Sequence, residues 1–85
     1  MAATDPEPEA SDEFLASLME TSLYSMGAFF SDEHPDLVDE VIGQSEAIEE
    51  RGLRRYAQDN KMSVEECFQT LLTGLAVRYY KAVAA

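Results

Sequence analysis

The chain has 85 residues, of which 46% are hydrophobic, and a formal net charge of −11. This composition is too apolar for a chain that is disordered throughout, and no apolar run reaches the roughly 18 residues that a membrane-spanning helix needs. The strong negative charge argues against direct binding to DNA, RNA or an anionic membrane surface, because charges of the same sign repel.

The start of the chain lacks the basic and apolar regions of a secretory signal. Cys67 is the single cysteine and has no partner for an internal disulfide, which is typical of a reducing compartment. We therefore expect a cytoplasmic protein.

Charge is distributed unevenly along the chain. Residues 1–50 contain fourteen Asp and Glu residues and no Lys or Arg, whereas residues 51–85 contain six Lys and Arg and three acidic residues. Such asymmetry indicates a partner of opposite charge, or pairing between the acidic half of one copy and the basic half of another. An antiparallel homodimer is one expectation from this pattern.

Residues 1–10, "MAATDPEPEA", alternate prolines with acidic residues. Proline blocks helix formation, and the segment has too little apolar surface to pack. We expect a disordered acidic tail over residues 1–10 and a single helical domain over residues 11–85.

The first predicted helix spans residues 12–29. Ser11 is a suitable N-cap, and the acidic residues Asp12 and Glu13 favour the first turn of a helix. Its apolar residues cover about half of the helix circumference at 100° per residue, which suits contact with two neighbours. These residues are Phe14, Leu15, Leu18, Met19, Leu23, Met26, Phe29 and Phe30.

The second predicted helix spans residues 34–58, with Ser31 or Asp32 as a cap before it and Pro35 in its first turn. Ser45 and Gly52 lie in the middle of its apolar stripe, where small side chains allow another helix to approach closely. Gly52 alternatively marks a kink. The stripe consists of Leu37, Val38, Val41, Ile42, Ile48, Leu53 and Tyr56.

The third predicted helix spans residues 64–83. Ser63 and Glu66 have the spacing of a capping box, and Met62 and Cys67 have that of the accompanying hydrophobic staple. The predicted core face of this helix consists of Val64, Cys67, Phe68, Leu71, Leu72, Leu75, Ala76, Tyr79, Ala82 and Val83. No alternating strand pattern competes with the three helices. The sequence therefore predicts an all-α, small three-helix domain: a long helical hairpin with the N-terminal helix packed across it.

Residues with catalytic potential do not form a recognisable motif. His34 is the only histidine and is expected on the surface, while Cys67 lies on an apolar helix face, where a thiol is ordinarily a small core residue. The acidic clusters lack the Glu-x-x-His spacing of carboxylate-bridged metal sites, and the glycines lack a phosphate-binding pattern. We expect no enzymatic activity, no cofactor and no metal site.

Surface residues give the strongest indication of function. Glu49 falls within the apolar arc of the second helix, so we expect it to reach solvent or a cation. Tyr24 is expected on the polar face of the first helix, and Val77 and Tyr80 on that of the third. Tyrosine is enriched at protein interfaces. The predicted partner-binding residues are Asp36, Asp39, Glu40, Glu46, Glu50, Tyr24, Val77 and Tyr80.

These features favour a small acidic helical protein-interaction module, such as an adaptor, assembly chaperone or regulatory subunit, whose protein partner has a basic surface. The alternative is an inhibitor that mimics nucleic acid. Carboxylates on helices that rise about 1.5 Å per residue approach the charge density of a duplex, and such a protein would occupy the basic cleft of a nucleic-acid-binding protein.

Overall fold

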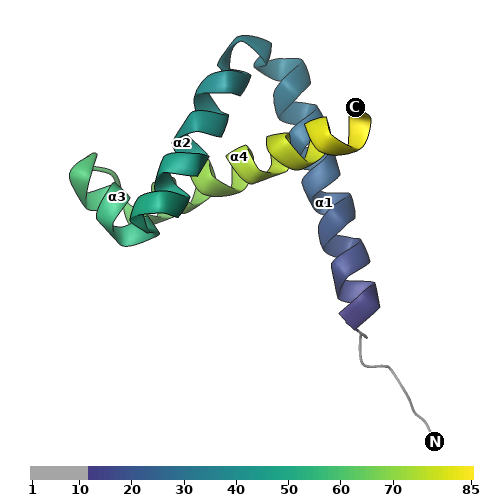
Figure 1. Ribbon diagram of the computed structural model, residues 1–85, viewed down its shortest axis with the longest axis horizontal. Helices are drawn as coiled ribbons and strands as arrows, with labels where there is room; N and C mark the ends of the chain where they lie inside the picture. Colours follow the sequence, from purple (N-terminus) through teal and green to yellow (C-terminus); the bar gives the residue numbers. More distant parts are fainter. Residues whose placement is uncertain (1–11) are drawn as a thin grey trace, which may run out of the picture.

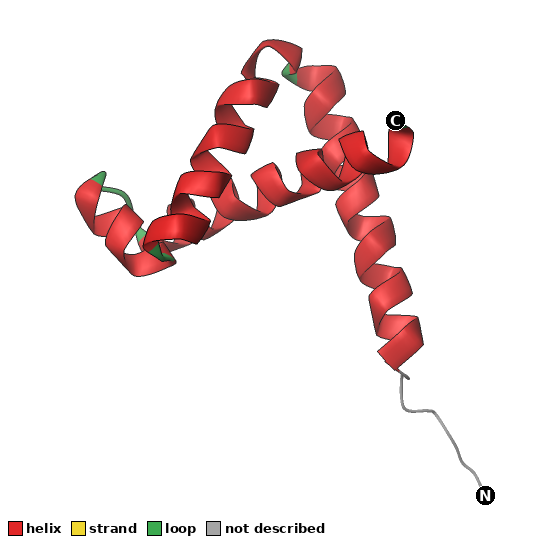
Figure 2. Cartoon of the chain, in the orientation of Figure 1, coloured by secondary structure: helices red, strands yellow, loops and turns green. Residues whose placement is uncertain are grey.

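The computed structural model describes residues 12–85, which form helices joined by short turns (Figures 1 and 2). This confirms the all-α class, while the predicted tail over residues 1–10 lies outside the described residues. In chain order the elements are α1 (Asp12–Glu33), the short 3-10 helix η1 (Pro35–Leu37), α2 (Val38–Arg51), α3 (Leu53–Asp59) and α4 (Val64–Ala84).

The three long helices form the sides of a triangle (Figure 1). Helix α4 packs against both α2 and α1, and the first half of α1 projects beyond its crossing with α4. The radius of gyration is 16.3 Å, larger than the roughly 12 Å expected for a compact domain of this size. The projecting half of α1 therefore has much of its surface uncovered by the rest of the described chain.

Gly52 divides the predicted second helix into α2 and α3. Its φ angle is +99°, a conformation that glycine adopts without the strain that a side chain would cause. Its N–H donates a 2.7 Å hydrogen bond to the carbonyl of Ile48, and its own carbonyl accepts a 3.0 Å bond from the N–H of Tyr56. The alternative prediction of a kink at Gly52 is thus confirmed, and the prediction of one continuous helix is wrong.

The turn between α1 and α2 lies later in the chain than expected. Helix α1 continues to Glu33, and the break falls at His34, whose N–H still donates to the carbonyl of Phe30 at 2.8 Å. Proline disfavours helical geometry in the residue before it but is accepted in the first turn of a helix, so α1 ends at Glu33, directly before His34, and Pro35 starts η1. No side-chain cap forms before η1, and the expected capping by Ser31 or Asp32 is wrong.

The capping box at the start of α4 is present as predicted. The Ser63 hydroxyl accepts from the Glu66 N–H at 3.0 Å, and a Glu66 carboxylate oxygen accepts from the Ser63 N–H at 3.1 Å. Met62 packs against the core cluster that contains Cys67, which confirms the staple. These contacts fix where α4 begins.

Ser63→Ala should lower the free energy of unfolding by about 1 kcal/mol, the usual effect of losing an N-cap side chain. Glu66→Ala should have a smaller effect, because the Ser63 hydroxyl still accepts from the residue 66 N–H. Urea denaturation followed by circular dichroism measures both. An unchanged midpoint in both variants would show that the box contributes nothing to stability.

The buried core is small. Ile48 of α2, Ala57 of α3 and Cys67 of α4 form its centre. Around this centre pack four partly buried side chains: Leu53, Tyr56, Met62 and Leu71. The core therefore lies at the end of the triangle where α2, α3 and α4 meet.

Small residues bring α4 close to both of its neighbours. Ser45 of α2 is fully buried, and a methyl group on Gly74 would overlap its side chain. At the contact between α1 and α4, a methyl group on Gly27 of α1 would lie 2.6 Å from Cβ of Tyr80. The predicted close approach at Ser45 is confirmed, with Gly74 as its counterpart.

This packing reverses part of the predicted core face of α4. Val77, expected on the outer face, is fully buried, whereas Val64 and Phe68, expected in the core, are each 47% exposed. The reason is that α1 and α2 contact α4 on adjacent sides through its small residues. Several larger apolar side chains of α4, including Val64 and Phe68, are left on its remaining side.

Candidate interaction surfaces

Five carboxylates gather where α1 meets α2, within nine consecutive residues. We call this group the acidic corner; it consists of Asp32, Glu33, Asp36, Asp39 and Glu40, all exposed. One ion pair touches it in the part of the chain that the structure describes, between Lys81 Nζ and Asp39 at 4.0 Å. The corner therefore carries a largely uncompensated negative charge.

The rest of the acidic face of α2 is partly neutralised by α4. Arg78 lies 2.9 Å from a carboxylate oxygen of Glu49 and 3.7 Å from one of Glu46. The expectation that Glu49 finds a cation is confirmed. Residues 1–50 contain no Lys or Arg that could offset this face, and Arg78 comes instead from α4, which packs against α2.

The predicted acidic binding residues thus fall into two groups. Asp39 and Glu46 pair with Lys81 and Arg78 of α4. The other three are exposed and form no ion pair within residues 12–85: Asp36, Glu40 and Glu50. A basic partner would gain most from this second group, because its carboxylates have no competing cation.

The tyrosine and valine residues predicted at a contact surface also take part in packing between α1 and α4. Tyr24 of α1 and Tyr80 of α4 stack edge to face, with ring centroids 5.2 Å apart and planes at 69°. Val77 is fully buried, so its expected outward position is wrong, whereas Tyr24 stays 42% exposed and Tyr80 is half-buried; partner contact at the two tyrosines stays a prediction. Such an aromatic pair is worth about 0.5–1.5 kcal/mol beyond its buried area, so it stabilises the crossing of α1 and α4.

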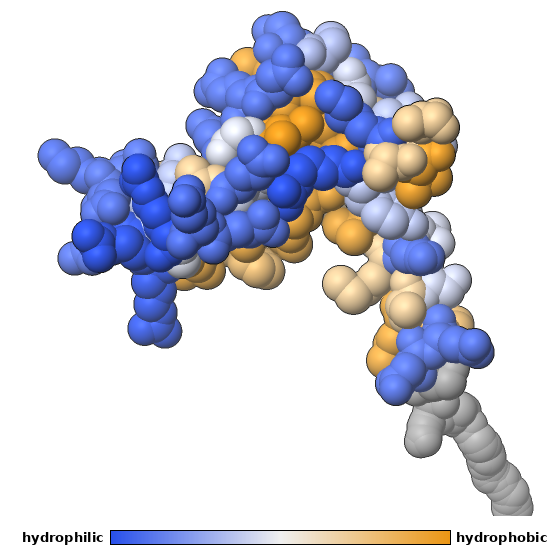
Figure 3. All heavy atoms as spheres, viewed as in Figure 1, coloured by the Kyte–Doolittle hydropathy of each residue, from blue (hydrophilic) through white to orange (hydrophobic). Residues whose placement is uncertain are grey.

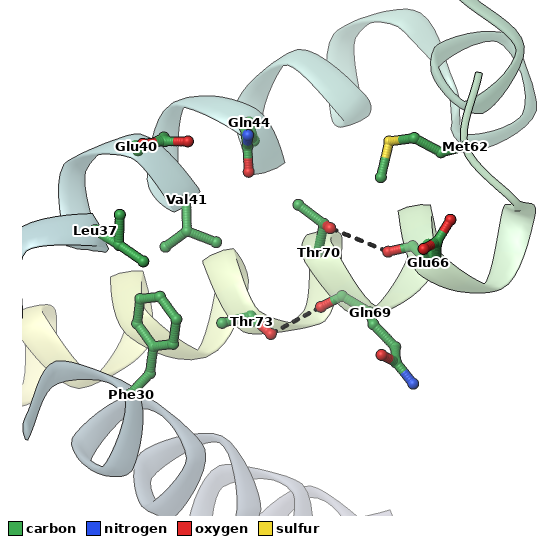
Figure 4. Close-up of a pocket in the computed structure, with 10 residues that line it drawn as sticks. All are labelled: Phe30, Leu37, Glu40, Val41, Gln44, Met62, Glu66, Gln69, Thr70 and Thr73. Carbon is green, nitrogen blue, oxygen red and sulfur yellow. Dashed lines mark hydrogen bonds between the residues drawn. The ribbon is translucent and has the colours of Figure 1, made fainter. Parts of the chain in front are cut away.

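A groove of about 420 Å³ lies between α2 and α4 and adjoins the acidic corner. Phe30, Leu37 and Val41 converge at one end of it, and Glu40 belongs to both the groove and the corner (Figure 4). The remaining lining is polar apart from Met62, and consists of Gln44, Met62, Glu66, Gln69, Thr70 and Thr73. The groove was not predicted from the sequence, because its lining comes from α1, η1, α2, α4 and the turn before α4, whose relative placement no local pattern specifies.

Polar side chains in the groove keep capacity for an outside partner. The hydroxyls of Thr70 and Thr73 donate to carbonyls of their own helix, at 3.0 Å and 2.8 Å. A hydroxyl that donates in this way still has lone pairs to accept with, and the amides of Gln44 and Gln69 can both donate and accept. The groove can therefore accommodate both apolar and hydrogen-bonding groups.

Burial changes the ionisation of two side chains, Cys67 and Tyr79. Cys67 is fully buried, and its burial raises the pKa of the thiol, so it is protonated rather than a nucleophilic thiolate. Burial, together with the charge of Glu20, raises the pKa of Tyr79. Among residues 12–85, no group of three His, Cys, Asp or Glu side chains is placed to hold a metal ion.

No protein-family model, curated protein or solved structure matches the chain. None of the described helices combines the length and apolar character needed to cross a membrane. What this surface could bind therefore has to be inferred from the chemistry of the acidic corner and the groove.

Proposed function

We propose that this chain is a protein-interaction module that binds a protein partner through the acidic corner and the adjoining groove. The observation that carries the proposal is the position of Glu40, a corner carboxylate that also lines the groove beside Leu37 and Val41. A partner segment that carries basic side chains next to an apolar side chain would contact the acidic corner and the groove at the same time.

Each part of this surface contributes differently to binding. The uncompensated corner would steer a basic partner toward the site and raise the association rate. An apolar anchor between Phe30, Leu37 and Val41 would remove apolar surface from water and slow dissociation. Such binding without chemistry suits an adaptor, an assembly chaperone or a regulatory subunit.

Mimicry of nucleic acid is the weaker alternative. A mimic needs an extended row of uncompensated anions, spaced like the phosphates of a duplex. Arg78 and Lys81 interrupt such a row along α2, where they pair with Glu46, Glu49 and Asp39. The uncompensated charge is concentrated at the corner instead.

Affinity capture with the full chain, followed by mass spectrometry, tests the proposal. Asp36→Lys combined with Glu40→Lys should lose the partner that the wild-type chain captures, and about 0.5 M salt should weaken capture only in part, because salt screens the charge pairs but not the apolar anchor. Asp39 and Glu46 are left unchanged because they pair with Lys81 and Arg78.

The matched control is Glu13→Lys combined with Glu20→Lys, an identical change in net charge at two exposed positions of α1 outside the corner. It should retain the partner. Equal loss in both double variants would mean that net charge alone governs capture, and equal retention would mean that the corner is not the binding surface. Capture of nucleic-acid-binding proteins alone would favour mimicry.

A further inference from the structure

The exposed face of α1 is apolar along most of the helix. Four of its side chains lie between 49% and 66% exposed: Leu15, Leu18, Met19 and Phe29. Met26 is 40% exposed on the same face. Figure 3 shows apolar side chains, in orange and tan, on the projecting part of α1. Together with Ser22, these residues form what we call the α1 stripe.

The α1 stripe points away from the rest of the fold. At 100° per residue, its members lie within about 60° of Ser22, whereas Gly27, which contacts α4, lies about 140° from Ser22. The contact with α4 therefore leaves the stripe uncovered by the other helices that the structure describes. The stripe also shares no side chain with the acidic corner or the groove.

The spacing of large side chains in the stripe is nearly symmetric about Ser22. Leu15 and Phe29 each lie seven positions from Ser22, and Leu18 and Met26 each lie four positions from it. When two such helices run antiparallel with their Ser22 residues opposed, each of these large side chains faces a large side chain of the other copy. The small Ser22 at the centre lets the two helices approach closely.

We propose that a second copy of this chain covers the α1 stripe, in a twofold-symmetric antiparallel pair of α1 helices. In a symmetric interface of this kind, Leu15 of each copy contacts Phe29 of the other, and Leu18 contacts Met26. This pairing goes beyond the binding of a basic partner and uses different side chains.

The available apolar area is sufficient for a stable pair. At about 200 Å² for a large side chain, the exposed fractions of the five apolar stripe residues amount to on the order of 500 Å² per copy. A standard interface buries about 800 Å² per partner, including its polar rim. Helix α1 has 22 residues and is about 33 Å long at 1.5 Å per residue. It is therefore long enough for polar residues at the rim to supply the remaining buried area.

Charge favours the antiparallel over the parallel arrangement. Helix α1 carries five acidic residues and no basic ones. A parallel pair would place the two acidic corners side by side, whereas an antiparallel pair separates them by the length of α1 and also opposes the helix dipoles.

The ends of an antiparallel pair still bring Asp12 and Glu13 near Asp32 of the other copy, so salt should strengthen the pairing. A dimer held by acid–base pairs between the halves of the chain would respond to salt in the opposite way.

Sedimentation equilibrium of the full chain tests the pairing. A dimer is expected at about 100 μM, with a Kd that falls severalfold between about 0.05 M and 0.5 M salt. Leu18→Gln combined with Met26→Gln should raise the Kd at least about tenfold, because apolar side chains are removed from the centre of the pair. Phe68→Gln, at an apolar position on α4 that is 47% exposed, should leave the Kd unchanged. A monomer at both salt concentrations, or an unchanged Kd in the double variant, would overturn the proposal.

Cysteine cross-linking tests the geometry independently, since the native Cys67 is fully buried. In a redox buffer, Ser22→Cys should form a disulfide-linked dimer rapidly, whereas Ser17→Cys, on another face of α1, should not. Leu15→Cys chains should cross-link to Phe29→Cys chains but not to each other. Cross-linking of Leu15→Cys with itself would show a parallel pair, and equal rates for Ser22→Cys and Ser17→Cys would show random collision; either result contradicts the proposed pair.

Discussion

Gly74→Ala is expected to lower the free energy of unfolding by about 1–3 kcal/mol, the usual effect of overpacking a well-packed site. The added methyl group would overlap the side chain of Ser45 and lie 2.8 Å from the carbonyl oxygen of Val41. Helix α2 must then move away from α4, because a backbone carbonyl cannot turn aside as a flexible side chain can. Urea denaturation of the full chain measures the loss.

Gly43→Ala is the matched control, because it makes the same chemical change on a neighbouring helix. No atom lies within 4 Å of a methyl group at this position, and alanine favours a helix by about 1 kcal/mol over glycine. This variant should therefore be more stable than the wild type. If both alanine variants changed stability alike, the close contact between α2 and α4 would be refuted.

Ile48→Ala should also have a large effect: we expect it to lower the free energy of unfolding by about 2–5 kcal/mol. Ile48 is 1% exposed at the centre of the core, and its truncation leaves a cavity beside Ala57 and Cys67. A core this small has few other contacts that compensate, so the variant should be largely unfolded at 37 °C.

Ile42→Ala provides the comparison, since it removes the same atoms from a half-buried position of the same helix. It should lower stability by less than half as much, as part of the side chain is already in contact with water. Thermal denaturation of both variants ranks them. A larger loss at position 42 would mean that the core lies elsewhere.

Local sequence signals predicted those parts of the fold that local interactions decide. The capping box at Ser63 and the kink alternative at Gly52 depend on a few neighbouring residues, and both are present. The start of α4 at Val64 follows from the same box. By contrast, the end of α1 was placed too early, because the cap residues considered there do not form a cap.

Packing between helices could not be predicted in the same way. Val77 was placed on an outer face because one broad apolar stripe on α4 appeared to be its core side. The structure instead gives α4 two contact sides made of small residues, including Gly74 and Ala76. A helical-wheel pattern treats glycine and alanine as neutral, so it missed the sides on which backbones approach each other closely.

The candidate site shows the same limit. The acidic corner is visible in the sequence because its five carboxylates are close together along the chain. The neutralisation of Glu46 and Glu49 by Arg78 joins residues about thirty positions apart, and the groove joins elements from α1 to α4. Both depend on the crossing of α4 with its neighbours, which no local pattern encodes.

Mapping the partner's contact surface by NMR tests the central proposal most directly. The isotope-labelled full chain would be titrated with the partner obtained by affinity capture, and changes in backbone amide shifts would be followed residue by residue. We predict that the largest changes cluster over residues 36–44 of η1 and α2 and residues 69–73 of α4, which border the acidic corner and the groove. Changes confined to the α1 stripe or to α3, with the corner and groove amides unmoved, would contradict it.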